Sequence, residues 1–207
     1  MRGIKLETKP IVFRKIGDEF QLPDWPPQFL EKANKMYSFL NGPDDLVTKL
    51  NAIYGLMDEM APFVASFTTC KKGCSHCCRY DVQITSFEAE YIFLKTGTPH
   101  RVGGQLTNGH NAPCPFLSNA GECGIYAHRP AVCRTYHALG DPSDCDDPDK
   151  DQLQYGSPAG DFGNQIYANL VGWIHFQTQH MGGHLRDIRD FFPHPREQVQ
   201  KHLSSRV

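Results

Sequence analysis

The residues best suited to chemistry in this sequence are its eight cysteines, and their spacing indicates metal binding. Cys74 and Cys77 are separated by two residues, the spacing with which two thiolates chelate one ion from a tight turn. Cys70 and Cys78 flank this pair. Metal sites commonly combine such a local group with distant ligands. The predicted ligands are therefore all eight thiols: Cys70, Cys74, Cys77, Cys78, Cys114, Cys123, Cys133 and Cys145.

Two rival explanations of the clustered cysteines are less consistent with the sequence. Free cysteine packs like a small hydrophobe, and positions 70, 74, 77 and 78 would share one side of a helix. The intervening residues are polar, however, and Gly73 weakens a helix, which leaves helix or loop open. Disulfides would need separate partners for the adjacent Cys77 and Cys78, and reducing compartments keep thiols free. We therefore expect thiolate ligands.

The number of thiols exceeds what one ion requires. Tetrahedral zinc takes four ligands, and the side chains of neighbouring Cys77 and Cys78 are expected to diverge. Two metal sites, or one polynuclear cluster with spare ligands, are both consistent with eight cysteines. Arg79, Arg129 and Arg134 lie close in sequence to cysteines and could donate hydrogen bonds to their sulfurs. Zinc and an iron–sulfur cluster remain equally compatible with this pattern.

Three sequence elements resemble a known family. They are the cysteine cluster Cys70–Cys78, the Pro113–Leu117 element (PCPFL) and the Cys123–Tyr136 element (CGIYAHRPAVCRTY). Together they are similar to the YkgJ-like CxxCxxCC family, described as zinc- or iron-chelating. The resemblance implies metal binding by the clustered cysteines and by Cys114, Cys123 and Cys133, with Cys145 at the place of a trailing family cysteine. This chain departs from the motif at Cys70, which three residues separate from Cys74.

Composition limits the other functions. The chain has 207 residues, of which 40% are hydrophobic and 21% charged, as in an ordinary globular protein. Its formal net charge is -2 and no basic run exceeds Lys71-Lys72, so nucleic-acid binding is not expected. Charges interrupt the N-terminal residues, and no apolar run is long enough for a membrane span. We therefore expect a soluble cytoplasmic protein, with oligomeric state undetermined.

The expected fold is mainly α, a small helical domain with an irregular cysteine-rich metal-binding segment. We expect an N-terminal helical region over residues 1–67, a cysteine-cluster module over 68–150, and a C-terminal helical region over 151–207 that packs on the module. Helices are predicted after Pro27, after an Asp44 or Asp45 cap, and after a Thr85–Glu88 capping box. A further helix around residues 166–174 should end at Gly182-Gly183, and residues 11–13 could form a short strand.

Three classes of function remain open. The first is a metal-binding module whose ion stabilises the fold while its surface binds a protein partner. The second is an iron–sulfur redox or modifying enzyme, and the third is a metal-transfer or metal-sensing protein. No phosphate loop, nucleophile elbow or HExxH element is present. No motif therefore identifies a reaction, and the sequence does not decide whether the protein is an enzyme.

Overall fold

The computed structural model describes residues 12–71, 73–103, 106–110, 112–147, 150–156 and 162–193. The chain divides into two compact units, each built from two stretches of sequence. The first unit comprises Met1–Lys72 and Arg134–Gly172, and the second comprises Gly73–Cys133 and Trp173–Val207. The three consecutive regions expected from the sequence stay a prediction.

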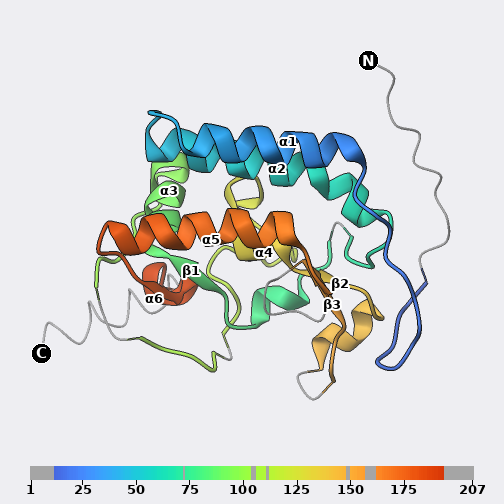
Figure 1. The fold of residues 1–207 in the computed structure, drawn as a ribbon. Helices are drawn as coiled ribbons and strands as arrows, with labels where there is room; N and C mark the ends of the chain where they lie inside the picture. Colours follow the sequence, from blue (N-terminus) through green and yellow to red (C-terminus); the bar gives the residue numbers. More distant parts are fainter. Residues whose placement is uncertain are drawn as a thin grey trace, which may run out of the picture. The chain divides into compact units, whose positions relative to one another are not determined.

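Two long helices, α1 (Pro27–Leu40) and α2 (Leu46–Ala65), pack against each other in the first unit (Figure 1). Pro27 occupies the first turn of α1, as predicted, because its missing N–H has no helical partner there. Asp45 caps α2 by accepting a hydrogen bond from the Thr48 N–H at 2.9 Å. Pro62 lies inside α2 without ending it, and the helix continues to Ala65.

The rest of the first unit includes a three-stranded sheet of β2 (His137–Ala138), β3 (Gln154–Gly156) and β4 (Phe162–Gly163). Strand β3 pairs antiparallel with β2 and parallel with β4. The short 3-10 helix η3 (Pro142–Asp146) buries Cys145 among acidic residues that are typical of a solvated loop. Val12 and Phe13 form no strand, and Ile11 of the predicted strand lies outside the described residues.

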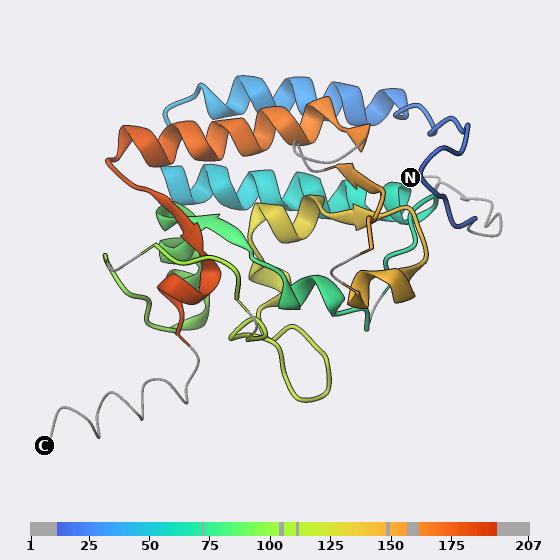
Figure 2. The same cartoon turned by 90° about the horizontal axis from the view of Figure 1, so that it is seen from below.

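The second unit has a two-stranded antiparallel sheet of β1 (Gln83–Thr85) and β5 (Leu185–Asp187), which Figure 2 shows as adjacent strands. Helix α3 (Ser86–Thr96) follows β1 directly and begins with the predicted Thr85–Glu88 capping box. Gly97 ends it in the left-handed conformation, at φ 72°. The remaining short helices are η1 (His76–Arg79), η2 (Tyr126–His128) and α6 (Ile188–Phe191).

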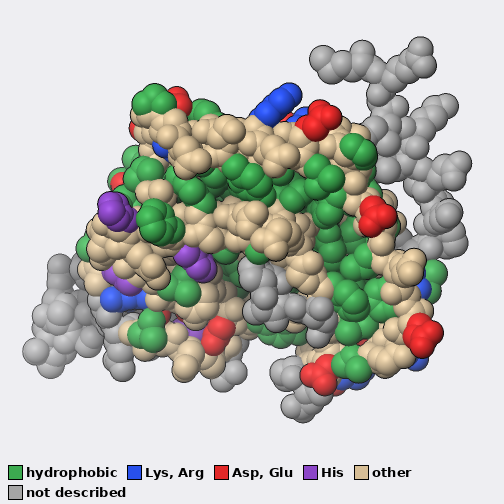
Figure 3. Space-filling view, in the orientation of Figure 1, with side chains coloured by type: hydrophobic (Ala, Val, Ile, Leu, Met, Phe, Trp, Pro, Cys, Tyr) green, Lys and Arg blue, Asp and Glu red, His purple; other side chains and the backbone are tan. Residues whose placement is uncertain are grey.

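Helices α4 (Ala131–Thr135) and α5 (Gln165–His180) each contribute residues to both units. Gly182, at φ 70°, follows α5 where the sequence predicted its end. The described residues are mainly helical, as predicted, and contain two small sheets. Within the described part of the chain, no helix combines the length and apolarity required to cross a membrane. On the face shown in Figure 3, the charged side chains of the described residues are scattered.

Candidate metal centre

The segment around Cys78 is held beside the segment around Cys114. Cys78 lies in η1, and its N–H donates to the Ser75 carbonyl at 3.1 Å, which forms a tight turn. The Cys114 N–H then donates to the Cys78 carbonyl at 2.6 Å. This backbone hydrogen bond joins two cysteines that are 36 positions apart in the sequence (114 minus 78). Of the residues for which the sequence left helix or loop open, 70–71 and 73–75 lie outside any helix, and Cys77 and Cys78 lie in the 3-10 helix η1.

A folded-back loop brings Cys123 toward Cys114. The Leu117 N–H donates to the Cys114 carbonyl at 3.0 Å, and Leu117 forms an isolated antiparallel bridge with Cys123. The Gly124 N–H donates to the Phe116 carbonyl at 2.8 Å and closes the loop further. The PCPFL and CGIY elements of the sequence thus form the two sides of one turn.

Cys133 is positioned by the start of α4. The first N–H of that helix, on Ala131, donates to Glu88 Oε1 at 2.8 Å. The other oxygen of this buried carboxylate, Oε2, accepts the Thr85 N–H at 2.9 Å within the capping box. Glu88 therefore ties the N-termini of α3 and α4 together, a second role that its sequence position did not reveal. The Cys133 N–H donates to the Pro130 carbonyl at 3.0 Å.

The result is a group of four cysteines, hereafter the cysteine quartet: Cys78, Cys114, Cys123 and Cys133. Cys114 belongs to the buried core of the second unit, and the other three are partly buried against that core. Each pair within the quartet is close enough for the charge of one sulfur to affect the pKa of the other. Four of the ligand positions proposed from the sequence thus lie in or against the same core cluster.

Burial and mutual repulsion keep three of these thiols protonated. Burial is the main cause that raises the pKa of Cys114 to about 12, and the charges of Cys78 and Cys123 add to it. Burial also raises the pKa of Cys123, and it raises the pKa of Cys133 well above 9.0. A hydrogen bond with Cys77 lowers the pKa of Cys78 to about 7, and Arg189 and Arg79 act in the same direction.

Arginine side chains surround the quartet, although not all are those expected from sequence proximity. Arg79 lowers the pKa of Cys78, and Arg129 acts against the rise at Cys123 and Cys133. Arg189, far from any cysteine in sequence, acts on Cys78 and Cys114 and was not identified as part of the site. Arg134 is buried in the first unit, where it pairs with Asp58 and lies over the Tyr54 ring at 4.4 Å.

The other four cysteines divide between the units. Cys74 and Cys77 lie in the same segment as Cys78, in the second unit. Cys70 and Cys145 belong to the first unit, where the Ala138 N–H donates to Cys70 Sγ at 3.2 Å and Cys145 is buried. None of the eight forms a disulfide. The role of these four as ligands stays a prediction.

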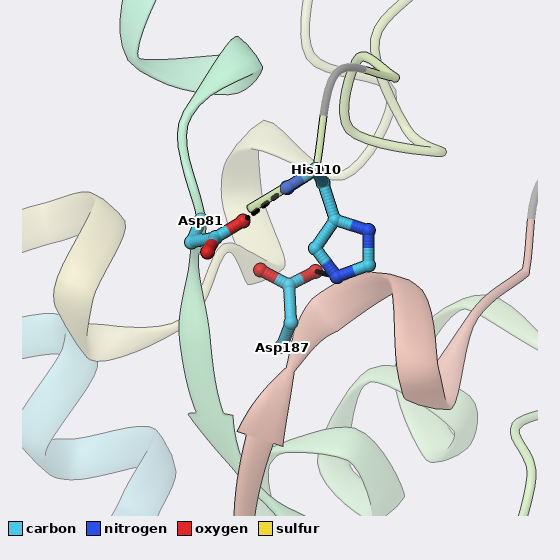
Figure 4. Close-up of side chains that lie close together, drawn as sticks. All are labelled: Asp81, His110 and Asp187. Atoms are coloured by element: carbon cyan, nitrogen blue, oxygen red, sulfur yellow. Dashed lines mark hydrogen bonds and ion pairs between the residues drawn. The ribbon is translucent and has the colours of Figure 1, made fainter. Parts of the chain in front are cut away.

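A second group of metal-ligand types lies in the second unit, where ligand atoms of Asp81, His110 and Asp187 are within 4.8 Å of one another (Figure 4). The Asp187 oxygens already accept four hydrogen bonds, from the Val82 N–H and from Arg189. Asp81 accepts from two backbone N–H groups of the His110 loop. Because Arg189 neutralises Asp187, we interpret this group as a hydrogen-bonded link rather than a cation site.

The donor set of the quartet fits zinc or iron. Both metals accept thiolate ligands, and four thiolates complete a tetrahedral zinc site or hold an iron–sulfur cluster. A bound cation would stabilise thiolates in a place where burial otherwise keeps them protonated. The nearby guanidinium groups would offset the remaining negative charge.

Comparison with known proteins agrees with this interpretation. Residues 69–156 match the CxxCxxCC family model, described as a "putative zinc- or iron-chelating domain". The matched segment contains all eight cysteines, and the resemblance expected from the sequence is confirmed. No curated protein and no solved structure matches the chain. Residues 69–156 of this chain are therefore similar to a CxxCxxCC domain.

Proposed function

We propose that the protein binds one zinc ion or one iron–sulfur cluster through Cys78, Cys114, Cys123 and Cys133. The observation that carries this proposal is the convergence of these four thiols, from three separate stretches of sequence, on one part of the second unit's core. The zinc- or iron-chelating description of the matched family supports the same chemistry.

The simpler explanation is that the four cysteines pack as small hydrophobes. Their surroundings argue against it. Arg79, Arg129 and Arg189 all act electrostatically on members of the quartet. A purely apolar cluster gains nothing from neighbouring guanidinium groups, whereas a dication with four thiolates keeps a charge of about -2 and is stabilised by them.

The main role of the metal would be to stabilise the fold of the second unit. Its binding energy would hold together the loops around Cys78, Cys114 and Cys123, which contain little regular structure. We place the protein in a reducing compartment, the cytoplasm, because free thiols persist there.

Elemental analysis of anaerobically purified protein tests the proposal, with matched replacements of two buried cysteines. Cys114 is 8% exposed and Cys145 4%, so serine at either position perturbs packing to a similar degree. Cys114→Ser should lose one equivalent of zinc or one cluster, whereas Cys145→Ser should keep the quartet's metal. A visible absorption band in the wild type would identify the iron–sulfur alternative. Full metal retention in Cys114→Ser, or complete loss in Cys145→Ser, would overturn the assignment.

A further inference from the structure

Arg189, at the second position of α6, directs its buried guanidinium group at backbone carbonyls around the quartet. The side chain donates from Nη2 to the Cys78 carbonyl at 3.2 Å and from Nη1 to the Tyr80 carbonyl at 3.1 Å. From Nε it donates to the Ala112 carbonyl at 2.9 Å. Only 8% of the residue is exposed. One side chain therefore links the segment at residues 78–80 with the segment just before Cys114.

The carbonyl of Cys78 is the meeting point of these contacts. It accepts the Cys114 N–H at 2.6 Å as well as Arg189 Nη2. Rotation of this peptide would move Cys78 and would break the hydrogen bond that holds Cys114 beside it. Arg189 therefore restricts the backbone of two quartet members at once.

Asp187 holds Arg189 in this orientation. Its carboxylate is completely buried and accepts from Arg189 Nη1 at 3.0 and 3.1 Å on its two oxygens. The Val82 N–H donates to Asp187 Oδ2 at 2.6 Å, which anchors the pair to the chain just before β1. The guanidinium group of Arg189 therefore has one fixed carboxylate and three carbonyl groups as hydrogen-bond partners. Its several N–H donors lie in one plane and reach all of them, which the single ammonium group of a lysine could not do.

The guanidinium is also a buried positive charge, and it donates to the backbone carbonyl of Cys78 itself. Outer-sphere groups of this kind orient metal ligands and stabilise their charge.

We propose that Arg189 is a positioning residue of the metal centre, held by Asp187, that fixes the backbone of Cys78 and Cys114. This inference rests on the proposed quartet site. It extends the centre beyond the matched family segment, which ends at residue 156, to the C-terminal part of the second unit.

The test compares Arg189→Gln with Arg186→Gln, a matched control because Arg186 lies three positions away and is less buried. Co²⁺ is added to the reduced, metal-free proteins, and its thiolate absorption bands and dissociation constant are measured by competition with a chelator. Arg189→Gln should bind Co²⁺ roughly 10–100-fold more weakly, with altered bands, as is typical when an outer-sphere partner of a metal ligand is removed. Arg186→Gln should match the wild type. Arg189→Lys, which keeps the charge without the fork, should show an intermediate loss.

Circular dichroism and thermal melting distinguish this role from a merely structural one. A structural role would lower the melting temperature of Arg189→Gln but leave the Co²⁺ affinity and spectrum of the folded protein unchanged, and that result would overturn the inference. If Arg189→Gln does not fold, Arg189→Lys is measured instead. A Co²⁺ affinity and spectrum of Arg189→Lys equal to those of the wild type would also overturn the inference. Wild-type protein that binds neither Co²⁺ nor a reconstituted cluster would instead refute the quartet site itself.

Discussion

The pKa values of the quartet, raised at three thiols and lowered at Cys78, determine how many protons metal binding should release at each pH. Every thiol must lose its proton to become a ligand, so protons compete with the metal and affinity rises with pH. At pH 7.5, Cys114, Cys123 and Cys133 are protonated, and Cys78, with a pKa of about 7, is about one quarter protonated. Zinc binding should therefore release about 3.2 protons.

The contrast with ordinary thiols appears at higher pH. At pH 9.5, Cys114, with a pKa of about 12, remains protonated in the folded protein, and the raised pKa values of Cys123 and Cys133 keep part of their protons bound. At least about 1.5 protons should therefore still be released. Four thiols with the ordinary pKa of 9.0 would release about 3.9 protons at pH 7.5 and about 1.0 at pH 9.5. The structure thus predicts a fall of at most about 1.7 protons, against about three for ordinary thiols.

A pH-stat experiment measures this count directly. Zinc is added as a weak chelate to weakly buffered, metal-free protein, and the base needed to hold the pH is recorded, with the chelate alone as the blank. Cys145→Ser, which leaves the quartet intact, should reproduce the wild-type count. A fall of about three protons between pH 7.5 and 9.5 would refute the burial of these thiols in the metal-free protein.

Three further predictions concern stability. Removing bound metal should lower the melting temperature markedly. A metal present at 100 times its dissociation constant adds about 2.7 kcal/mol to the free energy of unfolding. An unchanged melting temperature after verified metal removal would contradict this prediction. Gly156→Ala should cost about 1–3 kcal/mol in urea unfolding, because φ is +101° and a Cβ would lie 2.5 Å from the Thr135 carbonyl oxygen. Gly163→Ala, where an added Cβ would meet nothing within 4 Å, is the control, and equal losses would show the strain argument wrong. Thr85→Ala should cost about 1 kcal/mol through loss of the α3 cap. The control is Thr98→Ala, a partly buried threonine outside the helix, and a loss no larger than the control's would refute the capping role.

Local signals in the sequence predicted the helices well. Pro27, Asp45, the Thr85–Glu88 pair and Gly97 act through neighbours within four residues, so their effects can be read from spacing alone. A proline inside a helix kinks or ends it, and α2 continues past Pro62 for three residues, so Pro62 does not mark the helix end. The burial of Cys145 could not be predicted, since the acidic residues around it are typical of a solvated loop.

The metal centre could be predicted only in part. Residue type identified all four quartet members as ligands, but spacing emphasised the Cys74–Cys77 pair and did not indicate which distant thiols would join Cys78. That convergence depends on long-range contacts, such as the Cys114 N–H on the Cys78 carbonyl and the Ala131 N–H on Glu88. Arg189 was missed for the same reason, because 111 positions separate it from Cys78 and only the fold brings them together.

The coordination shell of the bound metal tests the quartet most directly. X-ray absorption spectroscopy of the Cys70→Ser/Cys145→Ser double variant examines the metal held by the second unit's own cysteines. Four sulfur neighbours are predicted, at about 2.3 Å if the metal is zinc, with no nitrogen or oxygen ligand. A shell with two sulfurs and two lighter atoms, or a variant that holds no metal, would contradict a centre formed by Cys78, Cys114, Cys123 and Cys133.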